Sequence, residues 1–108
     1  MVNVPLAPRT GGDATRKVAE ERLLSALDAF RPELIYISAD FDAHRDDDLA
    51  NLGWVESDYA WLTARILDVA HRHAKGRIIS ILEGGYALHV LAQSVGVHVG
   101  VLLDAVDA

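Results

Sequence analysis

The fold of this 108-residue chain is decided by LIYISADFDAHR, residues 34–45. The stretch begins as an apolar run that reaches Ala39, and a short run rich in β-branched and aromatic side chains predicts a buried strand. It then changes to the polar side chains of Asp40, Asp42 and His44. A strand with this ending places carboxylate and imidazole groups at the mouth of a sheet.

A second apolar run, RIISIL at residues 77–82, also predicts a strand and is followed directly by EGGY at residues 83–86. Between the two runs, apolar side chains at helical spacing predict a helix from Ser57, a candidate N-cap, to about Ala74. Two strands joined by a helix of this length are expected to be parallel, with a right-handed crossover. Because parallel strands present ligands at their carboxyl ends, both polar loops should meet at one edge of the sheet.

Two further helices are expected outside this unit. Residues 1–12 contain prolines and glycines and predict an irregular segment. Asp13 is a candidate cap for a helix that should end near Phe30, because Pro32 disfavours helical geometry at the residue before it. Residues 87–103 are ambiguous, since VGVHVGVLL alternates like a strand while other apolar positions keep helical spacing. We predict a helix there, because strand–helix–strand–helix order buries it on the sheet.

Composition excludes several classes of protein. The chain is 51% hydrophobic and 24% charged, which suits one globular domain. Its net charge of −6, with no cluster of Lys and Arg, argues against a nucleic-acid partner. The lack of cysteine excludes disulfides and thiolate metal sites. No apolar run approaches the ~20 residues that span a bilayer, and the N-terminus does not resemble a signal peptide. We therefore expect no membrane partner and a cytoplasmic location.

The side chains at the two strand ends suit metal-assisted hydrolysis. Asp42 and His44 are ligand types appropriate for Zn²⁺, and Tyr86 follows two flexible glycines that let it reach a substrate oxygen. The alternative is that Asp and His at strand ends only cap helices or bind loop amides, and spacing alone does not separate the two. The acidic run at residues 46–48 is expected to be a solvated turn. His98 is expected to be a packed histidine at the edge of the core.

Two motifs, SADFDAH at residues 38–44 and LEGGY at residues 82–86, are specific when they occur together at this separation. They resemble the zinc-dependent histone deacetylase family, including acetylpolyamine amidohydrolases and acetoin-utilisation proteins, and the likeness runs from about Asn3 to Leu103. The resemblance implies an α/β fold, here a fragment of the arginase–deacetylase three-layer fold with parallel strands flanked by helices. It also implies hydrolysis of an acetylated amine, such as acetyl-lysine or an acetylpolyamine, at one Zn²⁺.

The resemblance also implies a role for each of four residues. Asp42 corresponds to a zinc ligand of the family. Tyr86 corresponds to the catalytic tyrosine that polarises the acetyl carbonyl and stabilises the oxyanion. Gly84 and Gly85 correspond to substrate-binding residues that shape the wall of the acyl tunnel. His44 follows the ligand in many bacterial members and receives no ligand role.

Two departures from the family pattern bear on function. Asp40 stands where the family has glycine and adds bulk and charge beside the metal loop. The chain also has no His-His pair, and no Asp-x-His precedes residues 38–44. We therefore expect residues 1–108 to be a single partial domain, the C-terminal part of a deacetylase-like domain, inactive and without zinc by itself. The alternative is a non-catalytic interaction module that keeps only the scaffold. The unpaired edges of two apolar strands predict a homo-oligomer.

Overall fold

Two strands, β1 (Ile35–Ala39) and β2 (Ile78–Leu82), pair in parallel in this computed structural model, which describes residues 1–106. Their first residues lie opposite each other and so do their last, so both strands end at the same edge of the sheet. The connection between them contains a long helix, α3 (Glu56–His73). The predicted parallel strand–helix–strand unit is therefore confirmed, and each strand begins one residue later than expected.

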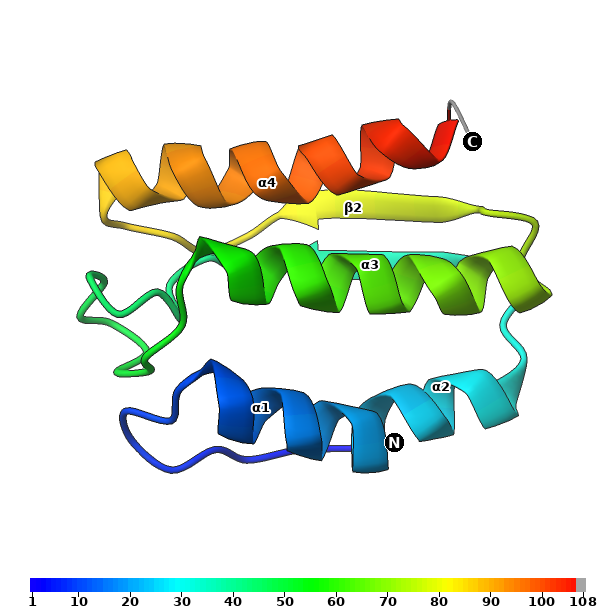
Figure 1. Ribbon diagram of the computed structural model, residues 1–108, viewed down its shortest axis with the longest axis horizontal. Coiled ribbons are helices and arrows are strands. Elements are labelled where there is room, and N and C mark those ends of the chain that lie inside the picture. The colour runs from blue at the N-terminus through cyan, green and yellow to red at the C-terminus, as the bar shows by residue number, and fades with distance from the viewer. Residues whose placement is uncertain (107–108) are drawn as a thin grey trace.

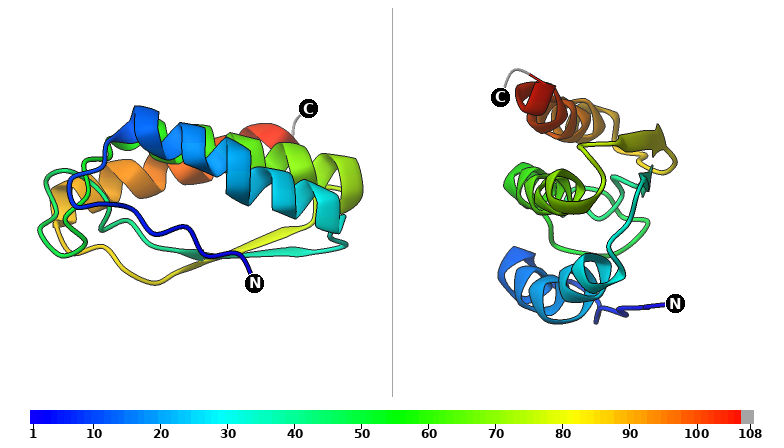
Figure 2. Two further views of the ribbon diagram at one scale, coloured as in Figure 1. Left: turned by 90° about the horizontal axis from the view of Figure 1, so that it is seen from below. Right: turned by 90° about the vertical axis from the view of Figure 1, so that its right-hand side faces the viewer.

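The helices lie on one face of this sheet. The first helical region runs from α1 (Gly12–Val18) through a π-helical segment, η1 (Ala19–Leu24), into α2 (Ser25–Phe30). The last helix is α4 (Leu88–Val106), which confirms the choice of helix over strand there. Figures 1 and 2 show α1–α2, α3 and α4 side by side in a single layer over the two strands. The described residues thus form a sheet and one helix layer of the α/β fold.

The opposite face of the sheet is open to solvent (Figure 2). Because side chains alternate along a strand, it carries Tyr36 from β1 with Ile79 and Ile81 from β2, all of them exposed. Parallel sheets are normally covered on both faces, so an apolar open face of this kind is unusual. No helix among the described residues is long and apolar enough to cross a membrane.

The first helical region ends where it was predicted to end, but it begins differently from the prediction. α2 ends at Phe30, as expected from Pro32, and Arg31 adopts the left-handed conformation that commonly ends helices. Asp13 was expected to be an N-cap, but it lies in the first turn of α1. It therefore favours that helix through its charge near the positive end, not as a cap.

The start of α3 also differs from the prediction, because Ser57 lies inside the helix and the cap position is Val55. Asp58 supplies the polar group that Val55 lacks: its Oδ2 accepts the Val55 N–H at 2.9 Å. The other carboxylate oxygen is 3.0 Å from Nη2 of Arg16 in α1. A residue three positions into the helix thus satisfies its first amide and joins it to the neighbouring helix.

The hydrophobic core between helices and sheet has two parts. The first packs Ile35 against the C-terminal half of α3, and its other buried members are Val69, Ala70 and Ala74. The second comprises Ala39 at the end of β1, Phe41 and Ala43 in the loop that follows it, and Tyr59 of α3. The loop that carries the candidate site is therefore anchored by its own buried apolar side chains.

His98 of α4 is buried where this helix meets α3 and β2. Its Nδ1 lies 2.8 Å from Oγ1 of Thr63 in α3, and its Nε2 lies 2.8 Å from Oγ of Ser80 in β2. Only 6% of the side chain's surface is exposed, and burial lowers its pKa below the ordinary 6.5. The prediction of a packed histidine is confirmed, and this residue links three secondary-structure elements.

Candidate functional site

The loops that follow β1 and β2 lie against each other, as the topology predicted. The Glu83 N–H donates to the Ala39 carbonyl at 2.9 Å, and the Phe41 N–H donates to the Gly84 carbonyl at 2.8 Å. These hydrogen bonds extend the strand pairing into both loops. The backbones that carry the two motifs are therefore fixed relative to each other at the carboxyl edge of the sheet.

Gly84 brings the predicted metal ligand and the predicted catalytic tyrosine together. A Cβ atom built on Gly84 would lie 3.5 Å from Oδ2 of Asp42 and 3.5 Å from the hydroxyl oxygen of Tyr86. The two functional oxygens can therefore be no farther apart than twice that distance. Both belong to one small site, and the tyrosine is 61% exposed, so a substrate can reach it.

Both glycines of the EGGY motif stand where a side chain would collide. A Cβ on Gly84 would lie 2.6 Å from Oδ1 of Asp40. Gly85 has a φ of 140°, which L side chains rarely adopt, and its Cβ would lie 2.6 Å from Cδ1 of Leu91. The close approach of the two loops thus depends on these glycines, whatever part they take in binding substrate.

Asp40, at the position where the resemblance implies glycine, binds the loop that follows β2. Its Oδ1 accepts the Gly84 N–H at 2.7 Å, so the added carboxylate binds the loop that leads to Tyr86. Burial and the neighbouring Asp40 charge raise the pKa of Asp42 above 3.8. A cation beside Asp42 would relieve this repulsion, and a carboxylate oxygen is an accepted zinc ligand.

Zinc catalysis ordinarily uses three protein ligands and a water molecule. Within residues 1–106, no group of three or more His, Cys, Asp or Glu side chains converges to hold a metal ion. Asp42 fits one position of such a site, and the described residues do not supply the other ligands.

His44 is committed to other partners. Its Nε2 lies 3.0 Å from Oε1 of Glu56, and its Nδ1 accepts the Asp46 N–H at 3.1 Å. The side chain is only 2% exposed. Both ring nitrogens therefore have protein partners, which is in keeping with the resemblance, where His44 receives no ligand role.

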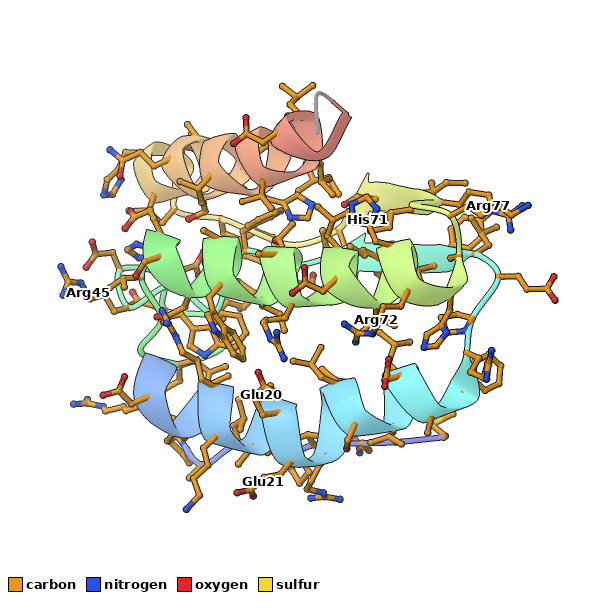
Figure 3. The ribbon with its side chains drawn as sticks, turned by 45° about the vertical axis from the view of Figure 1, so that its right-hand side comes forward. Glu20, Glu21, Arg45, His71, Arg72 and Arg77 are labelled. Carbon is orange, nitrogen blue, oxygen red and sulfur yellow. The ribbon has the colours of Figure 1, made fainter. Side chains whose placement is uncertain are left out.

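Histidines at the far end of α3 are also remote from the site. Figure 3 shows His71 and Arg77 at the end of the molecule opposite Arg45, which belongs to the loop after β1. Nearby, Arg72 pairs with Asp28 of α2, their charged atoms 2.9 Å apart. This end of the helix layer is joined by ion pairs and takes no part in the candidate site.

Sequence reasoning missed Asp47, because the run at residues 46–48 was expected to be a solvated turn. Asp46 and Asp48 are exposed, but Asp47 is only 4% exposed. Its Oδ2 accepts the N–H groups of Tyr86 at 2.8 Å and Ala87 at 3.0 Å. These partners lie 39 and 40 residues away in the chain, so no local pattern marks the middle acid of the run.

Both oxygens of the Asp47 carboxylate accept backbone amides. Its Oδ1 accepts the Leu49 N–H at 3.0 Å, in addition to the two amides bound by Oδ2. Burial acts to raise the pKa of Asp47, but the three amide donors outweigh it and hold the pKa below 3.8. An open cavity of about 570 Å³ lies beside this contact and is lined by residues 46–49 with Tyr86 and Ala87.

Comparison with known proteins identifies the family of this chain. The histone deacetylase domain family matches residues 1–102. Type-2 histone deacetylase 1 of Dictyostelium discoideum is 41% identical over 104 residues, which are 96% of this chain and 7% of that protein. The histone deacetylase-like amidohydrolase of Pseudomonas aeruginosa is 41% identical over 86 residues, which are 80% of this chain and 23% of that protein.

A solved structure shows the same arrangement of elements. The HD domain of HDA15 matches with a TM-score of 0.83 and 30% identity, covering 91% of this chain and 27% of that chain. Like the two relatives above, it is much longer than the segment that matches. The two motifs, the parallel sheet and these similarities agree, and the chain belongs to the histone deacetylase domain family.

Proposed function

We propose that this chain is the C-terminal part of a zinc-dependent amidohydrolase that removes the acetyl group from an acetylated amine, such as acetyl-lysine or an acetylpolyamine. One observation carries the proposal. An oxygen of the Asp42 carboxylate and the Tyr86 hydroxyl oxygen each lie 3.5 Å from the position that a Cβ atom on Gly84 would occupy. Because the chain spans only part of its relatives, this activity is proposed for the complete protein, and the chain alone is expected to be inactive.

Tyr86 would act on the acetyl carbonyl. Its exposed hydroxyl donates a hydrogen bond to the carbonyl oxygen, and this bond strengthens as negative charge develops during attack by water. Gly84 has no side chain beside this hydroxyl, and Gly84 and Gly85 would shape the wall of the tunnel that holds the acyl group. Asp42 would supply one oxygen ligand to Zn²⁺, which polarises the carbonyl and activates water when it is bound.

A chimera tests this proposal. The matching segment of the Pseudomonas aeruginosa amidohydrolase is replaced by the corresponding residues of this chain, and hydrolysis of an acetylated substrate of that relative is measured together with zinc content. Tyr86→Phe should lower kcat by about 10²-fold, the usual effect of losing one oxyanion donor. Tyr36→Phe, the same chemical change on the open face of the sheet, should leave kcat unchanged.

Asp42→Asn should lower the zinc content of the chimera. A chimera in which Tyr86→Phe and Asp42→Asn change neither kcat nor zinc content would overturn the proposal. A folded chimera that keeps its zinc but has no activity would favour the alternative, a non-catalytic module that retains only the scaffold.

A further inference from the structure

The backbone at Tyr86 is held by a side chain from the opposite loop. Asp47 lies five residues after Asp42 in the loop that follows β1, and it binds two consecutive amides of the loop that follows β2. It is the Asp47 carboxylate, not the strand pairing, that reaches the tyrosine itself. The strand-like hydrogen bonds end at Gly84, and Asp40 also binds only the Gly84 amide.

We propose that Asp47 is a positioning residue that fixes the Tyr86 hydroxyl relative to the Asp42 carboxylate. This inference rests on the proposed function, because it acts through the catalytic tyrosine. Only 4% of the Asp47 surface is exposed to solvent, and both of its carboxylate oxygens accept backbone amides. Its third partner, Leu49, belongs to its own loop, so the carboxylate connects the two loops directly.

The Asp47 carboxylate lies beside the start of α4, which strengthens this connection. Ala87, one of its two amide partners across the site, directly precedes Leu88, where α4 begins. The N-terminal end of a helix carries partial positive charge and unpaired N–H groups, so an anionic carboxylate is favoured there. Tyr86 is thus held between the packed helix on one side and the strand pairing on the other.

Asparagine cannot reproduce this arrangement. Asp47→Asn keeps the size of the side chain but has one acceptor oxygen, whereas Asp47 uses two. If the oxygen faces Tyr86 and Ala87, the amide NH₂ faces the Leu49 N–H, and two donors oppose each other. The replacement should therefore loosen the Tyr86 backbone without opening a cavity in the core.

The hydrogen bonds are tested first in the unmodified chain. A long-range HNCO experiment on labelled protein should show couplings from the Tyr86 and Ala87 amide nitrogens to the Cγ carbon of Asp47. In Asp47→Asn, these two amides should exchange with solvent faster and shift upfield. Asp48→Asn removes the same charge from the exposed neighbouring residue and should leave both amides unchanged. Absence of the couplings, or equal effects of the two variants, would overturn the proposal.

The consequence for catalysis is tested in the chimera. Asp47→Asn should lower kcat by about tenfold to a hundredfold, the cost of misplacing a catalytic group, with little change in KM. The loss should largely disappear in a Tyr86→Phe background, because Asp47 acts through the hydroxyl that this variant lacks. Asp48→Asn should match the parent in both backgrounds.

The outcomes separate the two proposals. A large effect of Tyr86→Phe with no effect of Asp47→Asn would overturn the positioning role and leave the proposed function intact. An equal loss from Asp47→Asn with and without the tyrosine hydroxyl would also overturn it, since a purely structural residue behaves in that way. If Tyr86→Phe itself has no effect, the proposed function fails, although the couplings would still establish the contact between the loops.

Discussion

Replacing His98 with leucine should lower the free energy of unfolding by about 2 kcal/mol, from two hydrogen bonds of about 1 kcal/mol each. Both bonds are 2.8 Å long and join His98 to Thr63 and Ser80. Thr63 keeps its bond to the Tyr59 carbonyl at 2.6 Å, so its hydroxyl is not left without a partner. Leucine is apolar and similar in volume, so the cavity term is small.

The same replacement should remove a pH dependence. Because burial lowers the pKa of His98 below 6.5, the unfolded chain binds this proton more readily than the folded chain. The contribution of His98 to stability is therefore fully present above pH 6.5 and is lost as the pH falls toward its lowered native pKa. The advantage of the wild-type chain over His98→Leu should be constant above pH 6.5 and shrink below it.

Urea unfolding, followed by the fluorescence of the two tryptophans, measures both effects across this pH range. His89→Leu, an exposed histidine on the same helix, is the matched control and should not reproduce either of them. The reasoning would be refuted by a His98→Leu variant with wild-type stability at neutral pH. A wild-type advantage that grows on acidification would refute it equally.

Three further predictions concern the metal, the glycine motif and assembly. The chain alone should bind no stoichiometric zinc and deacetylate no acetyl-lysine or acetylpolyamine, because we assign it a single zinc ligand; one tightly held zinc per chain, with turnover lost in Tyr86→Phe, would contradict this. Gly85→Ala should cost about 1–3 kcal/mol in urea unfolding because of its φ of 140° and a leucine atom 2.6 Å from the new Cβ. Gly96→Ala, with open space around its Cβ, should instead stabilise α4 by up to about 1 kcal/mol, and equal effects would contradict the steric argument. The chain should self-associate through the open sheet face, so sedimentation at micromolar concentration should give a mass above 11.7 kDa that Ile81→Lys lowers; a wild-type species of 11.7 kDa at all concentrations would exclude this.

The strands and helices were predictable because their signals are local. The apolar run that ends at Ala39 and the helical spacing after Ser57 each lie within one short window of sequence. The parallel pairing then followed from the length of the connection between the strands. For the same reason, the meeting of Asp42 and Tyr86 at one sheet edge followed from topology before any contact was known.

The contacts that sequence reasoning missed are chiefly those between residues distant in the chain, such as Asp58 with Arg16 and Asp47 with Tyr86. Ser57 is a better cap by residue type than Val55, but Asp58 occupies the position from which a carboxylate reaches the first amide and also meets Arg16. Asp47 has exposed acids on both sides, and nothing in its own loop distinguishes it from them. Hydrogen bonds between a side chain and a backbone amide about 40 residues away produce no repeating pattern in the sequence. Only the structure reveals them.

Two acids of the loop that follows β1, Asp47 and Asp42, have different contacts, and their pKa values shift in opposite directions. Asp47 accepts three backbone amide hydrogen bonds, which lower its pKa and favour its anionic form. Asp42 is partly buried beside the Asp40 carboxylate, and its pKa is raised instead. Amide donors have already compensated the charge of Asp47, whereas the charge of Asp42 still favours a cation. The opposite directions of these pKa shifts therefore follow from what each carboxylate contacts.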